Sequence, residues 1–187
     1  MSDYSAAERQ ILLKTARDAI QYTLDQDGPM HVDPEEYPEN LRTARASFVT
    51  LELNGQLRGC IGSLVAHQPL IQDVAHNAYA AAFADPRFPQ VTDEEAPQLS
   101  IHISVLSVPE PMSFSSEADL LQQLRPGVDG LILTDGVYRS TFLPIVWEQI
   151  PDPAQFLAHL KAKAGLPSNY WSNSIRFERY TAELIGA

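Results

Sequence analysis

Hydrophobic and polar positions at the start of the chain follow the spacing of an amphipathic helix. Ser5 and Glu8 have the three-residue spacing of a capping box, and apolar residues then recur every three or four positions. This pattern predicts a first helix that runs to about Asp25. The next segment, 26–40, carries three prolines and a glycine and is predicted to be an irregular connection.

A β-hairpin is predicted next. Residues 46–53 are rich in aromatic and β-branched side chains, which favour a strand. Asn54 and Gly55 then form the dipeptide typical of a tight turn, in which both residues adopt positive φ. The return strand contains the segment 57–62, Leu-Arg-Gly-Cys-Ile-Gly.

The patterns that follow predict a helix and then a strand, and the second half of the chain repeats this order. Pro69 suits the first turn of a helix, whose apolar stripe continues to Ala82. Residues 99–105 alternate between apolar and polar side chains, as in a half-buried strand. The elements predicted in the second half are a helix through Leu124, a strand at 131–134, an Asp135-Gly136 turn, a return strand at 137–143, a helix from Asp152 to Gly165, and a final strand at 174–185.

These elements predict an α+β fold. Each half reads hairpin, helix, strand, which indicates a mainly antiparallel sheet with flanking helices. We expect one domain over residues 1–187, with two lobes of about 1–110 and 111–187 that share one core around a cleft. A structural pseudo-repeat is a hypothesis here, because the two halves show no sequence identity that would indicate duplication.

Composition and charge narrow the function classes. The chain has 24 acidic and 13 basic residues and a formal charge of −11, which disfavours binding to nucleic acid or to an anionic membrane. A single cysteine excludes an internal disulfide framework and a multi-thiolate zinc site. The polar N-terminus and the lack of a long apolar run predict a cytoplasmic protein.

The segment 57–62 holds the sharpest candidate chemistry. Strand alternation predicts that Arg58 and Cys60 project from the same face, where the guanidinium would favour the thiolate. Arg58 could equally bind an anion or pair with a carboxylate, and Cys60 could be a packed thiol. Gly59 and Gly62 indicate a bulge, or a place where backbone or a ligand comes close.

Other candidate residues could assist this thiol. His76 and Glu148 are the predicted proton-transfer partners, since a nucleophilic cysteine needs a base. The alternative for His76 is a solvated or locally bonded side chain. Glu148 would be held against the apolar Trp147 ring, and the alternative there is a carboxylate at a helix start beside a packed aromatic. Asp85 and Arg87 lie in a proline-bounded loop that suits either ligand binding or a stiff turn with an ion pair. The spacings typical of metal sites and of phosphate-binding loops do not occur, so we predict no metal and no cofactor.

Several blocks together resemble the AMME-syndrome chromosomal-region protein family, also called AmmeMemoRadiSam system protein A. The resemblance covers nearly the whole chain in the family's order. It rests on Leu57-Arg58-Gly59-Cys60-Ile61-Gly62, Ala82-Phe83-Ala84-Asp85-Pro86-Arg87-Phe88, Thr141-Phe142-Leu143-Pro144 with Val146-Trp147, and Lys163-Ala164-Gly165-Leu166-Pro167 followed by Tyr170-Trp171.

The resemblance implies a two-lobed α+β domain with a cleft near segment 57–62. It carries over Arg58, Gly59, Cys60 and Gly62 as the site, and Asp85 and Arg87 less directly. Two positions depart from the family pattern, which has glutamine where Ile145 stands and an acidic residue where His102 stands. The family's name implies association with a Memo-like protein and a radical S-adenosylmethionine protein, and it assigns no reaction.

Two functions remain open from the sequence. The first is a site at Arg58 and Cys60 that binds or transforms a small, anionic ligand, with the cysteine as nucleophile or thiol carrier if the protein is an enzyme. The second is a non-catalytic partner module, in which the glycines and the loop 85–89 form a docking surface for the Memo-like or radical enzyme.

Overall fold

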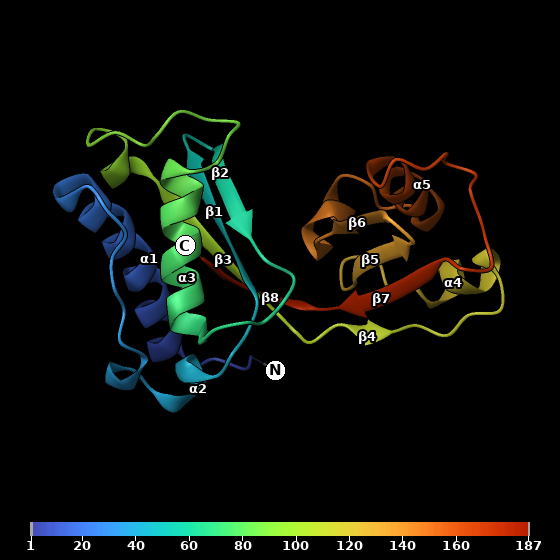
Figure 1. The fold of residues 1–187 in the computed structure, drawn as a ribbon, viewed down its shortest axis with the longest axis horizontal. Coiled ribbons are helices and arrows are strands. Elements are labelled where there is room, and N and C mark those ends of the chain that lie inside the picture. The colour runs from blue at the N-terminus through green and yellow to red at the C-terminus, as the bar shows by residue number, and fades with distance from the viewer. Residues whose placement is uncertain (1, 187) are drawn as a thin grey trace. The chain divides into compact units, whose positions relative to one another are not determined.

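The structure is a computed structural model that describes residues 2–186 (Figure 1). It divides into two compact units. Unit 1 comprises the described residues of 1–106 and 183–187, and unit 2 comprises Ser107–Ala182. The predicted α+β class is confirmed, because each unit combines helices with a four-stranded sheet. The predicted cleft between two lobes stays a prediction.

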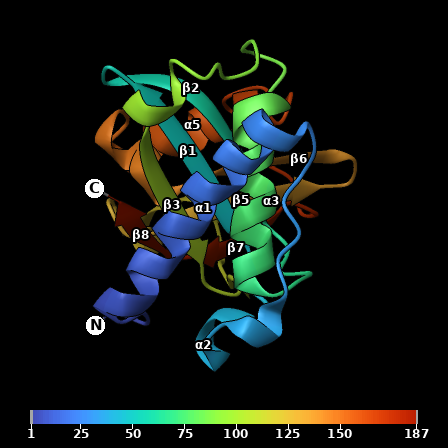
Figure 2. The same ribbon diagram turned by 90° about the vertical axis from the view of Figure 1, so that its left-hand side faces the viewer.

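Unit 1 packs two long helices on one face of its sheet (Figure 2). The first helix starts at the predicted capping box. The Ser5 side chain accepts a hydrogen bond from the Glu8 main-chain amide, and the Glu8 side chain accepts one from the Ser5 main-chain amide. Buried side chains of both helices and the sheet form one hydrophobic core. The bounds are α1 Ala6–Gln26, α3 Leu70–Phe83, β1 Ser47–Leu53, β2 Gln56–Gly62, β3 Ser100–Leu106 and β8 Ala182–Gly186, with strand order β2-β1-β3-β8.

Two sequence predictions in unit 1 need correction. The connection at 26–40 is not wholly irregular, because it contains the 3-10 turn η1, Pro34–Glu36, and the start of the short helix α2, Glu39–Arg42. The final strand, predicted as one element, is two strands that belong to different sheets. Residue 181 separates them, so the first part joins the sheet of unit 2 and β8 joins the sheet of unit 1.

Unit 2 has its own core around a second sheet. Trp147 and Phe156 stack in this core with their ring centroids 3.8 Å apart. The predicted Asp135-Gly136 turn is present, and Gly136 has the positive φ of 62° that favours glycine. The bounds are β4 Glu110–Pro111, α4 Glu117–Gln123, β5 Gly130–Asp135, β6 Tyr138–Phe142, η3 Pro144–Glu148, α5 Pro153–Lys163 and β7 Arg176–Tyr180, with strand order β4-β7-β5-β6.

The topology repeats between the units. In unit 1 the hairpin β1–β2 precedes α3, and β3 then pairs antiparallel with β1. In unit 2 the hairpin β5–β6 precedes α5, and β7 pairs antiparallel with β5. The hairpin, helix, strand order predicted for each half is therefore confirmed as a repeat of topology. Within residues 2–186, none of the helices combines the length and the apolar character that a membrane span requires.

Candidate functional site

A β-bulge separates Arg58 from Cys60. Across the hairpin, Cys60 lies opposite Thr50 and Gly59 opposite Leu51, but Leu57 lies opposite Glu52. Arg58 is thus an extra residue on β2, and the alternation of faces breaks at this position. The prediction that Arg58 and Cys60 share a face assumed an unbroken two-residue period, which the bulge at Arg58 interrupts.

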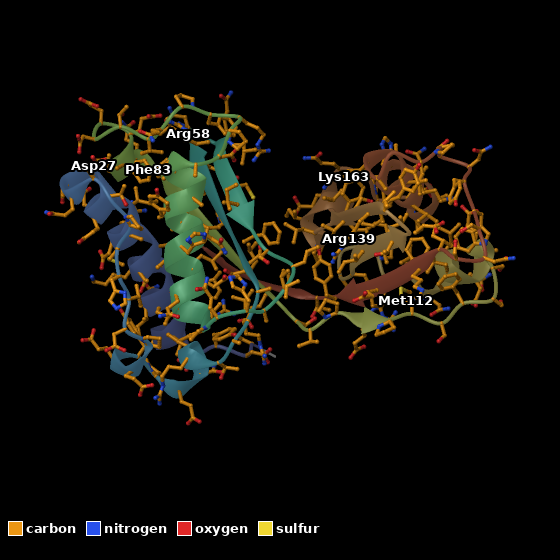
Figure 3. The ribbon with its side chains drawn as sticks, in the orientation of Figure 1. Asp27, Arg58, Phe83, Met112, Arg139 and Lys163 are labelled. Atoms are coloured by element: carbon orange, nitrogen blue, oxygen red, sulfur yellow. The ribbon has the colours of Figure 1, made fainter. Side chains whose placement is uncertain are left out.

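Arg58 instead forms a buried ion pair with Glu95. Its Nε and Nη2 donate to the two Glu95 carboxylate oxygens at 2.8 and 3.1 Å, and only 8% of the residue is exposed. These hydrogen bonds from Arg58 are the main reason that the pKa of Glu95 is lowered. The guanidinium also lies 6.0 Å from the centre of the Phe88 ring. Arg58 is labelled in Figure 3. Arg58 therefore anchors the loop that follows α3.

Asp85 and Arg87 hold the main chain of Cys60. The buried Asp85 carboxylate accepts the Cys60 amide hydrogen at 3.0 Å, and Arg87 Nη2 lies 3.4 Å from the Cys60 carbonyl oxygen. Arg87 also donates to Asp85 through Nε and Nη2, at 3.0 and 2.7 Å. Because β2 is an edge strand, its outward amide and carbonyl groups need such partners. The structure thus brings together Cys60, Asp85 and Arg87, three of the predicted site residues.

This arrangement has a clear electrostatic effect. Hydrogen bonds from Arg87 hold the pKa of Asp85 far below its usual range, and the amide of Cys60 adds to this. The pKa of Arg87 is raised, first by the hydrogen bond to Asp85 and least by the charge of Cys60. A cation therefore does lie close to Cys60, but it is Arg87.

The Cys60 side chain faces Thr50, a residue that was not predicted. Its sulfur lies 3.2 Å from Thr50 Oγ1 and is half-buried. Since the Cys60 amide points outward to Asp85, Cys60 and Thr50 form a non-hydrogen-bonded pair, in which facing side chains come closest. His102 is the next residue in this row, opposite Thr50 on β3. The Asn54-Gly55 turn alone would place Cys60 opposite Val49, and the bulge shifts the register by one residue to Thr50. The turn together with the bulge that Gly59 indicated was therefore the sequence signal for Thr50.

His102 is held on the same face of the sheet. Its Nε2 lies 3.6 Å from a Glu52 carboxylate oxygen. A Cβ added to Gly186 would lie 2.4 Å from His102 Nδ1, so glycine makes room for the imidazole. Two strand spacings separate Cys60 from His102, about 9.5 Å, which is too far for direct proton transfer.

Gly59 and Gly62, the two glycines of segment 57–62, leave no empty space beside their Cα atoms. A Cβ on Gly59 would lie 2.1 Å from the Ala81 carbonyl oxygen of α3. A Cβ on Gly62 would lie 2.2 Å from the Phe48 ring. Protein atoms fill both positions, which fits the close approach of other protein atoms that the sequence left open beside ligand binding.

His76 does not act as a base for Cys60. It is exposed on α3, where it lines a surface pocket with His31 and Tyr79. The helix covers the sheet face to which Gly59 points, whereas the Cys60 thiol points to the opposite face. The sheet therefore lies between the two side chains.

Glu148 is not packed against an apolar surface as predicted. It is exposed at the end of η3 in unit 2, while the neighbouring Trp147 is buried and donates to the Asp129 carbonyl oxygen at 2.7 Å. Glu148 belongs to unit 2, whereas Cys60 belongs to unit 1. Across the same residues, no group of three or more His, Cys, Asp or Glu side chains is placed to hold a metal ion.

Comparisons with known proteins place this arrangement in a family. A protein of Methanothermobacter thermautotrophicus is 39% identical over 183 residues, which cover 97% of this chain and 95% of that protein. Protein MJ0810 of Methanocaldococcus jannaschii is 37% identical over 159 residues, or 81% of this chain and 77% of that protein.

The fold agrees with a solved structure. The crystal structure of uncharacterized protein PH0010 from Pyrococcus horikoshii matches with a TM-score of 0.84 and 33% identity, and the match covers 92% of this chain and 88% of that one. The AMMECR1 family model matches residues 13–185. The chain therefore belongs to the AMMECR1 family, as the motifs around Cys60 and Asp85 indicated.

Proposed function

We propose that the protein binds or transforms a small anionic ligand at Cys60 and Arg87. One observation carries this proposal: the Arg87 guanidinium lies at the peptide group of Cys60, the only cysteine in the sequence. The Arg87 side chain is also 54% exposed, so a ligand can reach it. Arg87 takes the role of anion clamp that the sequence suggested for Arg58, whose guanidinium is already paired with Glu95. If the ligand reacts, Cys60 is the nucleophile or thiol carrier.

The geometry supports this role in two ways. Asp85 fixes the Arg87 side chain through two hydrogen bonds, so little side-chain entropy is lost when an anion binds. The Nη1 group of Arg87 makes no hydrogen bond within residues 2–186, and it is the group that can contact a ligand.

The test is alkylation of Cys60 in the folded protein at neutral pH with an anionic reagent, iodoacetate, and with a neutral one, iodoacetamide, followed by intact mass. We expect Arg87→Gln to slow the reaction with iodoacetate more than the reaction with iodoacetamide, because it removes the cation that would attract the carboxylate of the reagent. Arg87→Lys should restore part of the iodoacetate rate. Lys14→Gln removes an exposed cation from α1 and should leave both rates unchanged. Equal effects of Arg87→Gln on the two reagents, or a thiol that reacts only after denaturation, would refute the proposal.

A second candidate function is a partner module. The loop after α3 exposes Pro86, Arg87 and Pro89, while the buried Asp85 fixes its conformation. Such preorganisation lowers the cost of docking. The family's association suggests a Memo-like protein or a radical S-adenosylmethionine protein as the partner. Co-purification that survives Cys60→Ala and is lost with Arg87→Ala would favour this function, and loss with Cys60→Ala would favour the ligand site.

A further inference from the structure

A pocket opens in unit 2 where the edge strand β4 leaves the sheet. β4 pairs with β7 only through Glu110 and Pro111, and one more main-chain bond follows, from the Met112 amide to the Phe177 carbonyl at 2.9 Å (Figure 3). Beyond that bond the two segments diverge. The space between them has a volume of about 480 Å³, within the range of small-molecule sites.

The apolar wall of this pocket is an ordered aromatic cluster. Phe114 packs edge-on against Phe177 and against Trp171, with ring centroids 5.6 and 5.5 Å apart. Trp171 also stacks on Phe177 at 6.0 Å, and the ammonium of the buried Lys161 lies 5.6 Å from the Trp171 ring. Phe177 is almost fully buried and Trp171 lies behind the wall, so Phe114 is the ring of this cluster that is open to a ligand, and the other two hold it in place.

Two opposite charges line the same pocket. Arg176 and Glu178 are two residues apart on β7, so they share a face and their Cα atoms lie about 6.6 Å apart. Within residues 2–186, neither side chain makes an ion pair or a side-chain hydrogen bond. The amide of Asn173, also in the pocket, makes no side-chain hydrogen bond within the same residues. A ligand that carries both charges would satisfy all three groups.

We propose that this pocket binds a free α-amino acid with an aromatic side chain. The ligand carboxylate pairs with Arg176, its ammonium pairs with Glu178, and its ring packs on Phe114. An aromatic side chain on the ligand is favoured because the accessible ring of Phe114 offers it an apolar contact beside the two charges. The proposal does not depend on Cys60, which belongs to unit 1.

The test is calorimetric titration of the full chain with L-phenylalanine. We expect saturable binding, and about tenfold or weaker affinity for phenylpropionate and for phenethylamine, each of which lacks one charge. Arg176→Gln and Glu178→Gln should each weaken phenylalanine binding by about tenfold or more. Arg139→Gln and Glu148→Gln remove exposed charges outside the pocket in the same unit, and they should leave the affinity for phenylalanine unchanged.

Tryptophan fluorescence gives a second measurement. Both tryptophans lie in unit 2, but only Trp171 contacts the pocket wall. Phenylalanine should change the emission of the unmodified protein, and Trp171→Phe should remove that change while binding persists by calorimetry. Absence of saturable phenylalanine binding would overturn the proposal. So would equal affinity for the singly charged analogues, or binding that Arg176→Gln and Glu178→Gln both leave intact.

Discussion

Asp85 is the residue on which the Cys60 segment depends most. Its carboxylate is almost fully buried and accepts hydrogen bonds from the Cys60 amide, the Arg87 amide and the Arg87 guanidinium. Burial alone would raise its pKa, but these hydrogen bonds outweigh desolvation and lower it. One side chain therefore joins the edge of β2 to the loop after α3.

We predict that Asp85→Asn destabilises the protein by about 1–3 kcal/mol near neutral pH, because the amide cannot accept all of these bonds. The effect depends on pH. Asp85 has a lower pKa when folded than when unfolded, so its contribution is complete above the unfolded value of about 3.9 and is lost as the pH falls toward the folded value. Urea unfolding of both proteins at neutral pH and at about pH 3 checks this. A difference that stays constant would contradict it.

Lys161 offers a different test at the residue scale. Its side chain is fully buried and its ammonium donates to Glu117 at 2.8 Å. We predict that Lys161→Met changes the free energy of unfolding by less than about 1 kcal/mol, because Met fills the space and needs no charge partner. Glu117→Gln should cost more, about 1–2 kcal/mol, since it leaves a buried ammonium without its carboxylate. Equal costs in a urea titration would rule out this asymmetry.

At the scale of elements, β2 and α3 approach each other through Gly59. The strand must come close enough for the Gly59 Cα to pack on the Ala81 carbonyl, which leaves no room for a side chain. This close approach, together with the bulge at Arg58, sets how the edge strand presents Cys60.

We predict that Gly59→Ala destabilises unit 1 by about 1–3 kcal/mol or more, because backbone atoms must move to admit the methyl group. Gly28→Ala is the matched control, since a Cβ there meets nothing within 4 Å, and it should cost nothing. The urea midpoint for loss of amide hydrogen-exchange protection in α3 measures both variants. A Gly59→Ala protein as stable as Gly28→Ala would show that α3 can move away from β2.

At the scale of the whole molecule, the described residues 2–186 form two hydrophobic cores that share no residue. Both tryptophans report on unit 2, and the amide protection of α3 reports on unit 1. We predict that Gly59→Ala lowers the urea midpoint for loss of amide protection in α3 and leaves the tryptophan fluorescence midpoint unchanged, because separate cores can unfold separately. If both midpoints move together by the same amount, the two units unfold as one.

Sequence alone determined the elements whose signals are local. The capping box at Ser5, the Asn54-Gly55 turn and the alternation of 99–105 each depend on neighbouring residues, and each is present as predicted. Family membership also followed from short motifs. The hairpin, helix, strand order of each half was predicted for the same reason, because periodicity and turn residues are read over a few positions.

Tertiary structure decided the site. Pairing with β1 fixed the bulge that separates Arg58 from Cys60, since one extra residue reverses the faces of a strand. Packing of α3 filled the space beside Gly59 and placed the sheet between His76 and the thiol. Folding of the later loop brought Asp85 and Arg87 to Cys60 across 25 and 27 residues. Such contacts depend on register and packing between distant segments, which local patterns of residues do not encode.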